Sequence, residues 1–370
     1  MILSSIHLKN FRRHRDSYIT FSDELNYIVG GNGQGKTSIL ESIYYLCTTK
    51  SYNSKTDGEV VSFNQNDFEI TGSFKDLTQE EIRIYYSLEE NKKHYFQNSK
   101  QIFRSADVIG KHPVVILTPN DHAISQGSPT DRRRFVDSVI SQASSLYLKN
   151  LLDYNKTLRQ RASLLSQLKE AKNKNSLEQL DAWSEKLAAA GVDIINHRKR
   201  FINEFNPYVT NAYKKIMKEE EKPEIIYQTI NNARTELNAN SFLGLLEECR
   251  EEEIKRGSNL VGPHRDEFVF EINNINLKTF GSQGQQKTFQ VVLRFAQFFY
   301  LKEKCGKTPI FLLDDVFGEL DAFRSGKISS SLKNLGQAFI TLTDMANFSF
   351  LERSRCDKVI HINKGCVSYA

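Results

Sequence analysis

The segment GGNGQGKT at positions 30–37 constrains this chain more than any other part of its 370 residues. It matches the pattern G-x-x-x-x-G-K-[ST], follows the apolar run 27–29, and opens a helix that apolar spacing predicts over 36–47. Glycines let backbone N–H groups turn inward around a phosphate, and a helix N-terminus adds partial positive charge. The segment therefore predicts a nucleotide phosphate site, the alternative being a glycine-rich turn without a ligand.

The residue types in this loop predict separate tasks. Lys36 is expected to reach the β- and γ-phosphates, and the Thr37 hydroxyl is expected to bind Mg²⁺. No N-K-x-D guanine-reading motif occurs, so ATP is the expected nucleotide. The other predicted ATP-binding residues are Gly30, Gly31, Asn32, Gly33, Gln34, Gly35 and Ser38.

A second acidic element lies near the C-terminus. Residues 310–315 read IFLLDD, an apolar strand that ends in two carboxylates. Asp314 is expected to hold Mg²⁺ as a Walker B aspartate, and Asp315 to orient the water that attacks the γ-phosphate. The alternative is that the pair only caps the next helix.

A third polar segment, FGSQGQQKT at 280–288, runs directly into an apolar helix predicted over 285–304. A polar loop at a helix N-terminus is an anion site, although an ordinary capping loop has the same composition. Two such helix ends would crowd one nucleotide. A homodimer in which each of these loops faces the partner's ATP is therefore the economical arrangement.

Apolar patterning divides the chain into two kinds of structure. Short strands are predicted at 4–8, 18–21, 26–29, 68–72, 81–87, 113–117, 267–272, 310–313, 338–342 and 358–362. Between them, apolar residues recur at helical spacing and predict a helical hairpin with arms of about 25 to 30 residues, too short for a long coiled coil. The expected fold is an α/β lobe split between 1–122 and 257–370, with a helical lobe inserted at 123–256 and segment 281–287 at their boundary.

Composition restricts the cellular setting and the partner. No stretch approaches the roughly 18 apolar residues of a spanning helix. The five scattered cysteines suit a reducing compartment, so a cytoplasmic protein without a membrane partner is expected.

The net charge of +5 hides an uneven distribution, because 131–218 holds 17 Lys/Arg against 9 Asp/Glu and 219–253 holds 3 against 10. The basic part is a candidate for sequence-independent contact with DNA phosphates. Its clusters supply the candidates Arg132, Arg133, Arg198, Lys199 and Arg200, of which the first two are alternatively structural.

Several motifs in one order resemble the ABC-type ATPase heads of the structural-maintenance-of-chromosomes group, and within it the bacterial RecF family. The likeness covers essentially the whole chain. Its motifs are LKNFRRH (8–14), the phosphate loop, GSPTDRRRFVD (127–137), LRQRASLL (158–165), VGPHRDE (261–267), GSQGQQKT (281–288) and LLDDVFGELD (312–321).

The resemblance implies further roles for residues and partners. Arg12 would approach the nucleotide phosphates, and Asp321 would lie in a D-loop that reports on the partner's site. The segment Ser282, Gln283, Gly284 and Gln285 would replace the ABC signature and act across the dimer, with Ser282 and Gly284 touching the γ-phosphate. Binding of double-stranded DNA near single-strand gaps, and loading of the RecA recombinase with RecO and RecR, are implied as well.

The chain also departs from its relatives. Asp315 is one methylene shorter than the glutamate of ABC transporters, and no switch histidine follows 339–342, so slow hydrolysis is expected. Asn53 stands where the family usually has arginine, which leaves open whether Lys50 or Lys55 substitutes. No Q-loop residue is assigned, and His264 receives no role beyond packing at the lobe boundary. Two other functions stay open, a transporter motor subunit and a nucleotide-sensing DNA-binding module that scarcely hydrolyses ATP.

Overall fold

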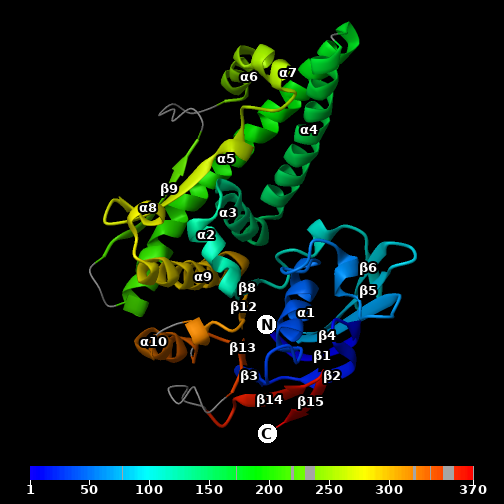
Figure 1. The fold of residues 1–370 in the computed structure, drawn as a ribbon, viewed down its shortest axis with the longest axis vertical. Coiled ribbons are helices and arrows are strands. Elements are labelled where there is room, and N and C mark those ends of the chain that lie inside the picture. The colour runs from blue at the N-terminus through cyan, green and yellow to red at the C-terminus, as the bar shows by residue number, and fades with distance from the viewer. Residues whose placement is uncertain are drawn as a thin grey trace. The chain divides into compact units, whose positions relative to one another are not determined.

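The computed structural model describes residues 1–76, 78–171, 173–217, 221–229, 238–319, 322–333, 335–344 and 354–369. The chain forms two compact units (Figure 1). The first unit comprises Met1–Asp121, Asn211–Glu220 and Lys287–Ala370, and the second comprises His122–Thr210 and Glu221–Gln286.

The first unit contains a mostly parallel sheet. Its strand order is β15-β14-β3-β13-β12-β8, with the edge strand β15 antiparallel. Strands β3, β8, β12 and β13 are buried along their whole length, which explains their largely apolar sequences, in which Asn26 of β3 and Thr341 of β13 are the buried polar residues. The strands are β3 (Leu25–Val29), β8 (Val114–Leu117), β12 (Ile310–Leu313), β13 (Ala338–Leu342), β14 (Lys358–Asn363) and β15 (Cys366–Tyr369).

A second, antiparallel sheet of the first unit has the order β2-β1-β4-β5-β6-β7. Its strands are β1 (Ile2–Phe11), β2 (His14–Thr20), β4 (Asp67–Lys75), β5 (Gln79–Ser87), β6 (Lys92–Gln97) and β7 (Lys100–Ile102). Helix α1 (Lys36–Thr48) shares one apolar core with both sheets, in which Phe11, Tyr45 and Phe68 meet edge to face. This core fixes the helix that follows the phosphate loop. Helix α10 (Ala322–Leu332) also belongs to this unit.

The second unit is mainly helical. Its elements are α2 (His122–Gln126), α3 (Pro129–Ala143), α4 (Ser145–Glu170), α6 (Ala239–Glu248), α7 (Arg250–Arg256), α8 (Leu277–Phe280) and the sheet β11-β10-β9. Helix α5 (Lys174–Met217) belongs to this unit up to Thr210. The strands of that sheet are β9 (Pro223–Gln228), β10 (Glu267–Ile272) and β11 (Ile275–Asn276). Helix α9 (Gln283–Cys305) starts at the end of this unit's sequence and continues in that of the first.

The predicted helical hairpin is confirmed, with one correction. Its first arm, α4, has 26 residues as expected, whereas α5 has 44 and exceeds the expected 25 to 30. Helix α5 continues because buried apolar residues such as Phe201, Phe205 and Val209 keep the helical spacing, and it runs through Pro207. None of the helices in the described ranges is long and apolar enough to cross a lipid bilayer.

The units do not divide where we predicted. Residues 257–286 belong to the second unit, although we expected the split lobe to resume at 257, and residues 211–220 belong to the first. The reason is strand β10, which pairs with β9 from Glu267↔Gln228 to Ile272↔Pro223, where Tyr227 stacks on Phe268. A strand pattern alone does not reveal which sheet the strand joins.

Candidate nucleotide-binding site

The phosphate loop lies between β3 and α1 of the first unit and is held from behind by a histidine. Gly33 and Gly35 have φ angles of 71° and 110°, which favour glycine. The buried His14 ring donates from Nε2 to the Gly35 carbonyl at 3.0 Å. A Cβ at position 35 would lie 2.9 Å from the same nitrogen, so the loop and the histidine are fitted to each other.

Lys36 points back into this loop. Its ammonium donates to the carbonyl oxygens of Gly30 at 2.7 Å and Gly31 at 3.0 Å. Burial lowers the pKa of Lys36, while the Asp315 and Asp314 carboxylates act in the opposite direction. A buried cation inside a glycine loop, at the start of a helix, is an arrangement suited to a polyphosphate.

The carboxylate of Asp314 lies at the end of β12 and is organised by hydroxyl groups. Thr37 and Thr341 donate to its Oδ1 at 3.0 and 2.9 Å, and Tyr52 donates to its Oδ2 at 3.2 Å. Burial raises the pKa of the Asp314 carboxyl, whereas the Thr341 and Thr37 hydroxyl hydrogen bonds lower it. Mg²⁺ prefers oxygen ligands and is usually held by one or two carboxylates together with phosphates, so Thr37 and Asp314 fit this ion.

Asp315 differs from its neighbour in backbone and exposure. Its φ is 52°, in the left-handed region that Asp tolerates better than most residues, and its N–H donates to the Thr341 hydroxyl at 2.8 Å. Asp315 is exposed, whereas Asp314 is buried. Two consecutive carboxylates thus have separate environments, one suited to an ion and one open to solvent.

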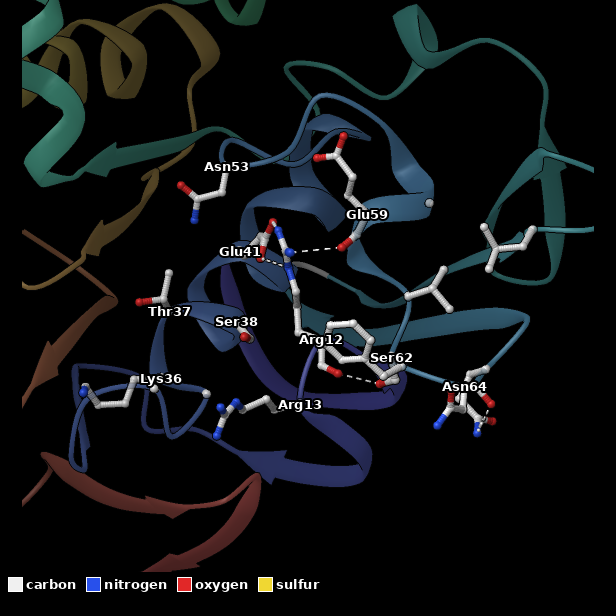
Figure 2. A pocket seen from close by; sticks show the side chains of 17 residues that line it. Arg12, Arg13, Lys36, Thr37, Ser38, Glu41, Asn53, Glu59, Ser62 and Asn64 are labelled. Atoms are coloured by element: carbon white, nitrogen blue, oxygen red, sulfur yellow. Dashed lines mark hydrogen bonds and ion pairs between the residues drawn. The ribbon is translucent and has the colours of Figure 1, made fainter.

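A cavity of about 940 Å³ extends from the phosphate loop across the first unit (Figure 2). Its wall includes Gly33, Gly35, Lys36, Thr37 and Ser38 of the predicted set, together with Arg12, Arg13, Glu41, Asn53, Glu59 and the segment 61–65. Asn53 lines this cavity, whereas Lys50 and Lys55 are not among its lining residues. Neither lysine therefore replaces the missing arginine in this wall.

Arg12 lines the cavity, but its guanidinium is bound to protein groups. It donates from Nε and Nη2 to the two oxygens of Glu41, at 2.9 and 2.7 Å, and from Nη1 to the Glu59 carbonyl at 3.0 Å. The Glu41 side chain is only 2% exposed, and it also accepts a hydrogen bond from Ser51. Arg12 Nη2 also donates to the Ser54 hydroxyl, so Arg12 joins α1 to the loop that carries Asn53.

The predicted signature residues form a helix cap. Ser282 Oγ accepts from Gln285 N at 3.1 Å, and Gln285 Oε1 accepts from Ser282 N at 2.9 Å, at the start of α9. Ser282 and Gln283 are exposed, and Gly284 is half-buried. The capping alternative is thus realised in a single chain, and contact with a partner's nucleotide stays a prediction. Asp321 lies outside the described residues.

The prediction of DNA contact is wrong for two of the arginines. Arg198 is only 2% exposed. Its guanidinium forms an ion pair with Asp137 at 2.9 Å and donates to the Pro263 carbonyl at 2.7 Å. Arg132 is also buried and forms a two-pronged ion pair with Glu267, with both contacts at 2.7 Å. Buried, paired cations do not reach DNA phosphates.

The other three basic candidates differ in exposure. Arg133 is half-buried and donates to the Asp266 carbonyl at 2.7 Å, which favours the structural alternative. Lys199 is half-buried and Arg200 is exposed. Lys199 and Arg200 are therefore the members of the predicted set that stay candidates for DNA contact.

His264 is half-buried in the second unit, beside the buried Tyr154. Tyr154 donates to its Nδ1 at 2.7 Å, and burial lowers the pKa of His264 to about 4. Its surroundings therefore give it a structural role in the second unit.

Comparisons with known proteins agree on one family. A family model described as an AAA domain matches residues 5–239. The chain is 39% identical over 97% of its length to the whole of the DNA replication and repair protein RecF of Chloroherpeton thalassium, and 34% identical over 99% to that of Agathobacter rectalis. A structure of the recombination mediator RecF with ATP, from the RecFOR pathway, has a TM-score of 0.91 and 30% identity, covering 100% of this chain and 97% of that one.

A more distant structure extends the likeness in fold alone. The match to the Smc head domain of Pyrococcus furiosus covers 100% of this chain and 96% of the Smc chain, at 15% identity and a TM-score of 0.57. The predicted fold class, an ABC-ATPase head with a split α/β lobe and an inserted helical lobe, is confirmed.

Proposed function

We propose that this chain, which belongs to the RecF family of DNA replication and repair proteins, is an ATP-driven DNA clamp of recombinational repair. In this proposal two copies close around two ATP molecules, double-stranded DNA near a single-strand gap binds the closed dimer, and slow hydrolysis releases it. The observation that carries the proposal is the phosphate loop with Lys36 inside it and the Thr37 hydroxyl 3.0 Å from the Asp314 carboxylate.

The nucleotide site defines what each residue contributes. Loop N–H groups and Lys36 would bind the phosphates, and Thr37 with Asp314 would hold Mg²⁺, which would supply neutralisation of phosphate charge. Asp315, exposed beside this pair, would accept a proton from the attacking water. Tyr52 and Thr341 keep the Asp314 carboxylate in one orientation through hydrogen bonds.

The signature loop supplies the reason for dimerisation in this proposal. The Ser282 hydroxyl and the start of α9 form an exposed helix N-terminus, which attracts anions. Ser282 and Gly284 would contact the γ-phosphate bound by a second copy, so that ATP, and not ADP, closes the dimer.

We expect Ser282→Arg to remove ATP-dependent dimerisation while ATP still binds, because the long cation fills the space that the partner's phosphate would take. Sedimentation velocity with and without ATP and Mg²⁺ measures the effect. Ser128→Arg is the matched control, since Ser128 is exposed at the start of α3 and its N–H donates to the Asp131 side chain at 2.8 Å, as the N–H of Ser282 does to Gln285. Dimerisation of Ser282→Arg equal to that of Ser128→Arg contradicts the proposed role of the signature.

Hydrolysis is tested separately through Asp315. We expect Asp315→Asn to lower turnover by about 100-fold or more, the range of a lost general base, with ATP affinity nearly unchanged. Turnover is measured with saturating gapped DNA. An unchanged low rate in wild type and variant favours the alternative, a nucleotide-sensing DNA-binding module with negligible hydrolysis.

DNA contact and partners belong to the same proposal. Lys199 and the exposed Arg200 would bind phosphates without reading bases, which predicts salt-sensitive, sequence-tolerant binding. RecO and RecR are the proposed protein partners in loading RecA, in the cytoplasm. A gel-shift series with gapped, duplex and single-stranded DNA, with and without ATP, tests which DNA the closed dimer prefers.

A further inference from the structure

Two adjacent arginines line the nucleotide cavity and differ in their surroundings. The Arg12 guanidinium is bound by Glu41 and the Glu59 carbonyl. Arg13 is exposed, and no hydrogen bond or ion pair of its side chain occurs in the part of the chain that the structure describes. Figure 2 shows the two side chains pointing in different directions, Arg12 toward Glu41 and Arg13 toward the side of the phosphate loop.

Arg13 lies against the middle of the phosphate loop. Its Nη2 is 4.0 Å from the position that a Cβ on Gly33 would occupy, and both residues line the cavity. The backbone N–H groups of this part of the loop cradle the α- and β-phosphates in phosphate loops of this pattern. A guanidinium at this place can donate two parallel hydrogen bonds to one phosphate.

Two contacts hold the backbone near Arg13 against the same loop. The next residue, His14, donates to the Gly35 carbonyl at 3.0 Å. In the β14–β15 turn, Gly365 donates to the Gln34 carbonyl at 3.1 Å, and a Cβ on Gly365 would lie 2.7 Å from the Arg13 carbonyl oxygen. The start of the side chain is therefore positioned before any ligand binds, which lowers the entropic cost of the contact.

The other basic side chains of the cavity wall already have partners. The lining residues include three basic side chains, of which Arg12 is neutralised by Glu41 and Lys36 lies inside the phosphate loop. Asn53 contributes an uncharged side chain to the same wall. Arg13 is the remaining positive charge in this lining, and it is free to follow a bound anion.

We propose that Arg13 is a nucleotide-binding residue that contacts the α- and β-phosphates, and that Arg12 is a positioning residue that ties α1 to the Asn53 loop. This inference rests on the proposed function, because it assumes a nucleotide in this cavity. A contact to the α- and β-phosphates strengthens ATP and ADP binding alike, whereas a γ-phosphate contact would favour ATP alone.

Calorimetric titration of the full chain with ATP and with ADP, each with Mg²⁺ and without DNA, tests the proposal. We expect Arg13→Ala to weaken both nucleotides about tenfold, the size of one charge-assisted contact, with the ATP-to-ADP affinity ratio and the Tm unchanged. Arg13→Lys should recover part of the affinity. Arg104→Ala is the control of equal charge, because Arg104 is exposed, pairs with Asp107 and lies outside the cavity.

Arg12→Ala should behave differently and lower the Tm, because it leaves the buried Glu41 carboxylate without its cationic partner. Arg13→Ala with wild-type affinity for both nucleotides overturns the inference, as does a loss restricted to ATP or a fall in Tm equal to that of Arg12→Ala. If the wild-type chain itself binds neither nucleotide, the proposed function fails together with the inference, which is a different result.

Discussion

Lys36→Ala is expected to weaken ATP binding by about 100-fold or more and to remove ATP-dependent dimerisation. The ammonium donates to two carbonyls of the phosphate loop and is the buried cation at its centre. Hydrogen bonds from a charged group contribute about 1.5–3 kcal/mol each, and a triphosphate would accept at least two from this residue. Calorimetry measures the affinity, and sedimentation velocity measures the dimer.

A matched control separates charge from position in this experiment. Lys50 is exposed and is not among the residues that line the cavity, so Lys50→Ala should bind ATP like the wild type. The Lys36 variant should keep its fold, because burial already disfavours the charged ammonium and alanine is a good helix residue. An ATP affinity within about threefold of wild type, at an unchanged circular-dichroism spectrum, contradicts the assignment of this loop as the nucleotide site.

The local parts of this site could be predicted from the sequence. The phosphate loop and α1 are contiguous, so their spacing alone indicates their geometry. Strands β12 and β13 have the predicted bounds because they are buried on both faces, which favours nearly continuous apolar runs, with Thr341 as the polar exception in β13. Asp314 follows from the end of such a run.

The side chains that organise the site could not be predicted in the same way. Tyr52, Glu41 and Thr341 come from a loop, a helix and a strand, and only the tertiary fold brings them to Asp314 and Arg12. A buried glutamate in a helix carries no motif of its own. The segment around Tyr52 does carry a signal, but the family resemblance points there to the missing arginine at Asn53 and not to the tyrosine hydroxyl.

The basic clusters gave a wrong prediction of DNA contact for a related reason. A run of basic residues gives no information on where carboxylates from other elements will lie. Asp137 of α3 and Asp266 beside β10 both meet Arg198 of α5, so the cation that looked suited to DNA is part of the interior of the second unit. Its neighbour Arg200, two residues on, faces solvent because the helix turns it away.

Arg198→Ala is therefore expected to destabilise the second unit by about 3–5 kcal/mol, the usual cost of removing one partner from a buried charge network. The guanidinium binds Asp137 through Nε and Nη2, and Nη1 binds the Pro263 carbonyl and, at 3.3 Å, Asp266. Without it the Asp266 carboxylate, itself 2% exposed, keeps the hydrogen bond from the Tyr227 hydroxyl and the more distant charge of Arg133. Urea unfolding followed by the fluorescence of Trp183, the sole tryptophan, reports on this unit.

The pH dependence of this loss distinguishes lost charge pairing from lost packing. Burial raises the pKa of the Asp266 carboxyl, while Arg198 lowers it. A carboxyl whose folded-state pKa lies above its unfolded value stabilises the fold when protonated, and that contribution is lost as the pH rises through the folded pKa. Removing Arg198 raises this pKa further. The loss of unfolding free energy in the variant should therefore be smallest near about pH 4 and grow toward neutral pH. Arg200→Ala should unfold like the wild type at every pH, since surface substitutions change stability by about 0.5 kcal/mol at most. If Arg198→Ala loses the same unfolding free energy near pH 4 and at neutral pH, this arginine contributes packing and not charge pairing.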